Sequence, residues 1–236
     1  MNPWYALKRL FPSRQRSKPV VHFLHIPKTG GTAIKHALQG AVSPKFEIAL
    51  HDHGFRLADV PNGEFAVFFL REPIERFVSG FNSRLRQGKP RYSSKWTADE
   101  AIAFERFSTP NDLAEALLSE DGATKQAALH AMNSINHVRS KMSHWVGTNL
   151  DTTDPRVLFV GFQENLNQDF ALLAEHLFLE PIPVLPGSEL DAHRNPPEMS
   201  RSLSPRAIAV IQDWYADDIK LYQVLRSKWH NKRNGH

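Results

Sequence analysis

Four short runs of apolar residues are spaced along the chain. Each is rich in the β-branched and aromatic side chains that favour strands. They lie at residues 20–26, 46–50, 65–70 and 157–162. The run at 65–70 is apolar at every position, which is typical of a strand buried on both faces of a parallel sheet. The pattern therefore predicts four strands.

Segments with the apolar periodicity of helices alternate with these runs. We expect helices at 32–38, 73–85, 170–177 and 204–225. Strands that alternate with helices predict an α/β fold of three layers, in which helices flank a central, mainly parallel sheet. Residues 86–156 carry no strand pattern, and we expect a helical insertion there, over the edge of the sheet that binds ligands.

The Lys and Arg residues are concentrated at the two ends of the chain. Five lie in residues 1–19 and four in residues 226–236, and neither segment contains Asp or Glu. Without these nine, 20 basic and 25 acidic residues remain, a balance of −5 against +4 for the whole chain. We therefore expect one domain at 20–225 between two basic tails. The first tail leaves open a peripheral contact with an acidic membrane surface.

The composition excludes several classes of site. The sequence contains no cysteine, so disulfides, thiolate metal ligands and a cysteine nucleophile are ruled out. No window approaches the roughly 18 consecutive apolar residues of a membrane-spanning helix. The apolar stretch in residues 1–19 is short and interrupted, so we expect no signal peptide there. We expect a cytoplasmic protein, with membrane-peripheral attachment through residues 1–19 left open.

A loop rich in glycine and hydroxyl side chains joins the first predicted strand to its helix. It consists of Pro27, Lys28, Thr29, Gly30, Gly31 and Thr32. Adjacent glycines let the backbone approach an anion, and the following helix N-terminus attracts negative charge. In a Walker A motif the lysine follows the last glycine and precedes a Ser or Thr that holds Mg²⁺. Here Lys28 precedes the glycines, so the loop predicts an anion site of another kind, with no obvious metal ligand.

A second phosphate-binding pattern follows the third predicted strand. Arg71 lies at the carboxyl end of that strand, where parallel sheets bind ligands, and Ser79 lies in the next helix. Residues 23–32 (FLHIPKTGGT) and 68–81 (FFLREPIERFVSGF) resemble two segments of sulfotransferases that use 3′-phosphoadenosine 5′-phosphosulfate (PAPS). These are the 5′-phosphosulfate loop and the 3′-phosphate segment. The type that the chain resembles is the carbohydrate one, which includes uronyl 2-O-sulfotransferases and many bacterial relatives.

This resemblance implies a P-loop-like fold, PAPS as the donor, no metal, and a hydroxyl-bearing acceptor such as a glycan or glycolipid. It also implies that Arg71 and Ser79 hold the 3′-phosphate. Lys28 would stabilise the charge that develops on the leaving phosphate. Arg194, in a late proline-rich segment, is expected to reach the 3′-phosphate or the acceptor.

A general base is expected after the second predicted strand, where two histidines follow each other closely. His53 is the first candidate and His51 the second, because imidazole can accept a proton near neutral pH. Their spacing of two residues would point both side chains the same way on an extended chain. Three more histidines are spaced by seven, too far apart along a helix for one zinc ion: His130, His137 and His144.

Two other functions fit part of the pattern. A P-loop-type nucleotide phosphotransferase would use the same loop, although the position of Lys28 argues against it. A non-catalytic nucleotide- or polyanion-binding protein would keep the loop without a base, and the histidines near residue 53 argue against that. No nucleic-acid partner is expected. We expect residues 86–156 to select the acceptor, which the sequence does not identify, just as it does not fix the oligomeric state.

Overall fold

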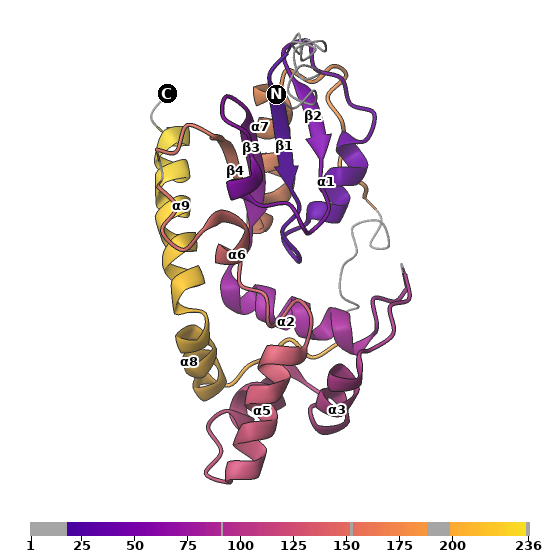
Figure 1. The fold of residues 1–236 in the computed structure, drawn as a ribbon, viewed down its shortest axis with the longest axis vertical. Coiled ribbons are helices and arrows are strands. Elements are labelled where there is room, and N and C mark those ends of the chain that lie inside the picture. The colour runs from indigo at the N-terminus through magenta and orange to yellow at the C-terminus, as the bar shows by residue number, and fades with distance from the viewer. Residues whose placement is uncertain (1–17, 91, 152, 188–198, 235–236) are drawn as a thin grey trace, which may run out of the picture.

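The computed structural model describes residues 18–90, 92–151, 153–187 and 199–234 (Figure 1). Within these ranges, four parallel strands form one sheet in the order β2-β1-β3-β4. The strands are β1 (Val20–Leu24), β2 (Glu47–Leu50), β3 (Phe65–Leu70) and β4 (Val157–Phe162). All four predicted strands are confirmed, and the fold is α/β with a parallel central sheet.

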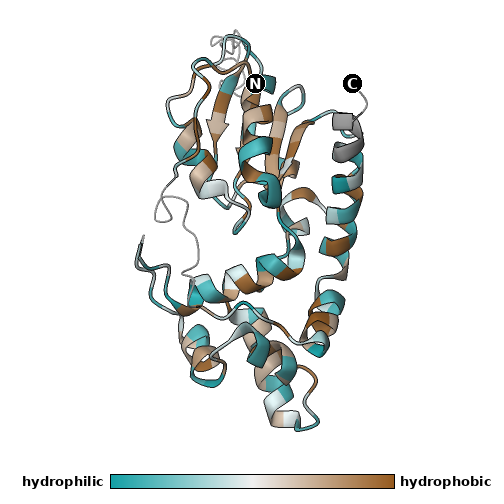
Figure 2. Cartoon of the chain, turned by 180° about the vertical axis from the view of Figure 1, so that it is seen from behind, coloured by the Kyte–Doolittle hydropathy of each residue, from teal (hydrophilic) through white to brown (hydrophobic). Residues whose placement is uncertain are grey.

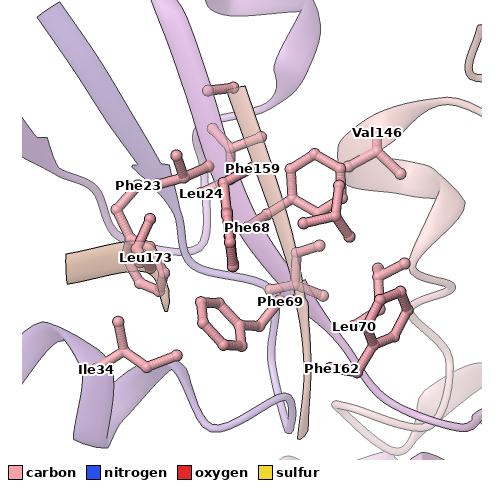
Figure 3. Close-up of a cluster of buried hydrophobic side chains, with 14 of the residues drawn as sticks. Phe23, Leu24, Ile34, Phe68, Phe69, Leu70, Val146, Phe159, Phe162 and Leu173 are labelled. Atoms are coloured by element: carbon pink, nitrogen blue, oxygen red, sulfur yellow. The ribbon is translucent and has the colours of Figure 1, made fainter. Parts of the chain in front are cut away.

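Helices cover both faces of this sheet. They are α1 (Gly31–Leu38), α6 (Ser143–Val146), α7 (Leu166–His176) and α9 (Ala216–Asn234). In the close-up of the core, Ile34 of α1 and Leu173 of α7 lie on one side of the strands, and Val146 of α6 lies on the other (Figure 3). The strands are largely hydrophobic, whereas the helices carry both kinds of residue (Figure 2). The helices therefore bury the two faces of the sheet, as the three-layer prediction requires.

A second hydrophobic core lies beyond the carboxyl ends of the strands, where α2 (Pro73–Leu85) crosses below the sheet (Figure 1). It is built by α2 with four further helices. These are α3 (Ala98–Arg106), α4 (Pro110–Ala116), α5 (Gly122–Ser134) and α8 (Pro205–Trp214). The described residues of 86–156 thus form helices and loops without a strand, as the sequence predicts.

The predicted helix at 204–225 is wrong in its bounds. The chain ends α8 at Trp214 and begins α9 at Ala216, with the buried Tyr215 between them. Tyr215 donates its hydroxyl hydrogen to the carbonyl of Val138 at 2.5 Å. Because α8 packs in the helical core and α9 packs against the sheet, one straight helix could not serve both.

Helix α9 extends into the segment 226–236, where we expected a basic tail. Helix α9 continues to Asn234, and Trp229 is buried against the sheet 5.6 Å from the ring of Phe159. Among the helices that the structure describes, none combines the length and apolar character needed to cross a membrane. Two predicted features, most of the basic segment 1–19 and the position of Arg194, lie outside the described residues.

Candidate active site

The sheet order creates a crevice at one end of the molecule. From β1 the chain goes to β2 on one side and then returns to β3 on the other side of β1. Ligands of open parallel sheets bind beyond the carboxyl ends of the strands at such a reversal. A cavity of about 1040 Å³ opens there, large enough for a nucleotide and part of a second substrate. It is lined by the loop after β1, helix α2, the start of α7 and three histidines, His25, His53 and His137.

The loop after β1 is shaped for close approach to the cavity. Lys28 and Gly30 adopt left-handed backbone conformations, with φ of 68° and 88°. A Cβ on Gly31 would lie 2.2 Å from the buried ring of His25, so only glycine fits at that position. No described side chain caps α1, and its first residues, Gly31 and Thr32, line the cavity. The local geometry is that of an anion-binding turn.

The predicted members of this loop do not all face the cavity. Pro27, Lys28, Gly30, Gly31 and Thr32 line it. The side chain of Thr29 is instead buried, and its hydroxyl donates a hydrogen bond to the carbonyl of Ile26 at 2.9 Å. The Thr29 hydroxyl therefore holds the shape of the loop and does not face a ligand.

Lys28 is surrounded by other cations. Burial and the nearby Arg86, Arg71 and Arg76 lower the pKa of its ammonium group to about 7. Each of these effects disfavours the charged form, so a bound anion would favour protonation of Lys28. The concentration of positive charge indicates a ligand with several negative charges.

Arg71 and Ser79 lie on the same cavity as the loop. Arg71 follows β3 directly, and its guanidinium lies 3.5 Å from the carboxylate of Glu75. Burial lowers the pKa of Arg71, and the nearby Glu75 and Glu164 oppose that shift. Its Nε is buried without a hydrogen-bond partner among the described residues. Two oxygens of a phosphate can accept from the planar guanidinium side by side and would supply one.

Arg76 does not line the cavity but supports the loop that does, and the sequence reasoning missed it. Its side chain is 1% exposed, and its Nε donates to the carbonyl of Pro27 at 3.0 Å. Burial lowers the pKa of Arg76, and its Nη2 has no partner within the described residues. Arg76 thus connects α2 to the phosphate loop from below. The only sequence signal was a charge between apolar positions of a helix that turns out to be buried on almost every side.

His53 is oriented by two hydrogen bonds to its neighbours. Its Nδ1 lies 2.7 Å from the carbonyl oxygen of His25, so Nδ1 carries the hydrogen and donates it. The indole Nε1 of Trp145 donates to the carbonyl of His53 at 2.8 Å. In the neutral ring, Nε2 then holds a lone pair, and the residue lines the cavity. This is the tautomer that a general base requires.

His25 lines the cavity beside His53, with ring centroids 4.1 Å apart. Burial, with the nearby charges of His53 and Lys35, lowers the pKa of His25 to about 3. The ring of His25 is therefore neutral at physiological pH. It packs between Gly31 of the loop and His53, and so couples the anion-binding turn to the candidate base.

His51 points into a different network. Its Nε2 lies 2.8 Å from Nδ1 of His22, whose Nε2 lies 2.5 Å from the carboxylate of Glu64. The ring stacks on Phe55 at a centroid distance of 3.6 Å. Burial and the neighbouring His22 lower the pKa of His51. His53 lines the cavity and His51 does not, and the identity of the base stays a prediction.

The three histidines spaced by seven also separate. His137 lines the cavity, whereas the exposed His130 lies 3.4 Å from Asp99 and His144 packs against Trp145. No group of three metal-ligating side chains occurs in the part of the chain that the structure describes. The entry of His137 into the site depends on a turn between α5 and α6, which no local pattern predicts.

The chain was also compared with known protein families. The model of the sulfotransferase family matches residues 14–223, which include the loop at 27–32, Arg71 and Ser79. No curated protein shows a significant match to the chain.

Proposed function

The chain belongs to the sulfotransferase family, which transfers sulfuryl groups, and we propose that PAPS is its donor and a carbohydrate hydroxyl its acceptor. One observation carries the proposal. The two positions that we expect to bind phosphate, the loop with Lys28 and the pair Arg71 and Ser79, line the same cavity. PAPS carries a phosphosulfate at its 5′ end and a phosphate at its 3′ position, so it needs two such positions.

The residues present fit this donor. The loop offers the first N–H groups of α1 and the ammonium of Lys28 to the 5′ end. The unpartnered Nε of Arg71 and the hydroxyl of Ser79 are available to the 3′-phosphate. We propose that these cations, together with Arg76, meet the negative charge of the donor, the task that Mg²⁺ performs for Walker A proteins.

Transfer itself requires a base and a stabilised leaving group. When bound, the donor supplies an activated sulfuryl group on its bridging oxygen. Nε2 of His53 accepts the proton of the acceptor hydroxyl as that oxygen forms its bond to sulfur. Lys28 stabilises the charge left on the phosphate as the old S–O bond breaks. The products are a sulfate ester, protonated His53 and 3′-phosphoadenosine 5′-phosphate (PAP).

The acceptor is proposed from the family resemblance and the shape of the site. We propose that the acceptor hydroxyl lies beside His53, which lines the cavity. Part of its wall comes from Tyr92 and His137, both from the region 86–156. We propose that this region selects the acceptor and that the acceptor is a glycan or glycolipid.

A transfer assay tests the proposal. The protein is incubated with PAPS and a panel of neutral and uronic-acid-containing oligosaccharides, and sulfated products are detected by mass spectrometry. Replacing His53 by Ala should lower turnover by about 10²–10⁴-fold and leave PAP binding unchanged. His36→Ala, an exposed histidine on α1 away from the cavity, is the matched control and should keep full activity. Phosphate transfer from ATP in place of sulfate transfer from PAPS would overturn the proposal.

A further inference from the structure

His137 occupies a place in the site that the roles above do not use. It follows α5, lines the cavity, and its ring lies 6.5 Å from that of His53 in an edge-to-face arrangement. Lys28 is also close enough to act on its charge. His137 therefore lies near both the candidate base and the lysine that serves the leaving group.

The backbone around His137 is built to hold it there. Its φ of 62° lies in the left-handed region that residues other than glycine rarely adopt. On the facing helix, a Cβ on Gly80 would come within 3.2 Å of the backbone and Cβ of His137. Gly80 follows Ser79, so its missing side chain lets His137 pack directly beside the proposed 3′-phosphate residue. Unusual backbone conformations of this kind are concentrated at functional sites. Lys28, which also lines the cavity, has a left-handed backbone conformation as well.

The surroundings of the ring determine what it can donate. Burial and the nearby charges of Lys28 and Arg76 lower the pKa of His137 well below its usual value, so the ring is neutral. Its Nδ1 is buried without a hydrogen-bond partner among the described residues. Because no described residue offers Nδ1 an acceptor and cations lie near the ring, we assign the lone pair to this nitrogen and not an orphaned N–H. The hydrogen then lies on Nε2, on the side of the ring away from the buried Nδ1.

We propose that His137 donates a hydrogen bond from Nε2 to an oxygen of the sulfuryl group during transfer. The inference rests on the proposed function. In-line transfer places sulfur between the acceptor oxygen beside His53 and the leaving oxygen beside Lys28. The ring of His137 lies 6.5 Å from that of His53 and close enough to Lys28 to interact with its charge. The non-bridging sulfuryl oxygens carry negative charge there. An N–H group of a neutral ring donates a hydrogen bond to them, while His53 accepts the proton of the acceptor hydroxyl.

Binding measurements separate this role from a structural one. PAP lacks the sulfuryl group, whereas PAPS carries it. Calorimetry on His137→Phe should show an unchanged dissociation constant for PAP and about a tenfold weaker one for PAPS. His137→Gln places an amide donor near the position of Nε2 and should recover most of the PAPS affinity. His130→Phe, an exposed histidine outside the cavity, is the control and should bind both nucleotides like the wild type.

Each result decides the question. Equal loss of PAP and PAPS affinity in His137→Phe, with an unfolding temperature like that of the wild type, would assign His137 to the nucleotide and overturn the inference. Unchanged affinity for both nucleotides would overturn it as well, while leaving the proposed donor intact. If His137→Phe does not fold, the affinities for PAP and PAPS are compared in His137→Gln and His137→Asn. If the ratio of the PAPS to the PAP dissociation constant is the same in these two variants, a donor at Nε2 is contradicted. A wild-type protein that binds neither nucleotide would remove the proposed function itself.

Discussion

Replacing Gly31 by Ala should damage both the stability of the protein and its candidate site. The added Cβ would lie 2.2 Å from Cδ2 and 2.7 Å from Nε2 of His25, distances that no packed side chain tolerates. The His25 ring is only 9% exposed and has the ring of His53 4.1 Å away, so it has little room to move. Overpacking of this kind costs about 1–3 kcal/mol. For a chain of this length, that lowers the unfolding temperature by about 2–12 °C.

A double-mutant cycle isolates the cause. His25→Ala removes the ring, so Gly31→Ala should cost at least about 1 kcal/mol less in that background than in the wild type. Unfolding in urea, followed by circular dichroism, measures the four free energies. Gly122→Ala is the control, because a Cβ on that first residue of α5 meets nothing within 4 Å. A stable Gly31→Ala variant, or a strictly additive cycle, would refute the packing argument.

Three further predictions concern charge. Because a bound phosphate should raise the pKa of Lys28 from about 7, the dissociation constant of PAP should rise by up to about tenfold per pH unit above pH 7. Lys28→Met should lose that slope in calorimetric titrations, and an unchanged slope would contradict the assignment. Arg71→Ala should weaken the binding of PAP by about 10–100-fold and the binding of ADP, which lacks the 3′-phosphate, far less. Equal losses of affinity for the two nucleotides would contradict the contact between Arg71 and the 3′-phosphate. Glu100→Ala leaves the buried Arg84, whose Nη2 lies 2.6 Å from the Glu100 carboxylate, without its counter-charge. It should cost about 3–5 kcal/mol in urea unfolding, and a loss no larger than that of the exposed control Glu105→Ala would count against it.

The strands and the phosphate loop follow from local patterns. The run at 65–70 is apolar at every position, which is typical of a strand buried on both faces of a parallel sheet. It could therefore be recognised as a strand without knowing which strands lie beside it. The break at Tyr215 could not be predicted, since apolar positions continue at helical spacing through it. That break results from tertiary packing, because the helical core holds α8 and the sheet holds α9.

The candidate site divides in the same way. The loop with Lys28 and the position of Arg71 follow from where strands end. The two-residue spacing of His51 and His53 misleads, because β2 ends at Leu50 and neither residue lies in an extended strand. Arg76 and His137 reach the site through contacts with Pro27 and Gly80, which lie 49 and 57 positions away along the chain. Such contacts leave no local pattern to recognise.

The most direct test of the central claim is the choice of nucleotide. Thermal unfolding of the wild-type protein is measured with PAP and with ATP, each in the presence and absence of Mg²⁺. Because binding stabilises the folded state, we predict that PAP raises the unfolding temperature equally with and without Mg²⁺. ATP should raise it less. Stabilisation by ATP with Mg²⁺, and none by PAP, would contradict the account.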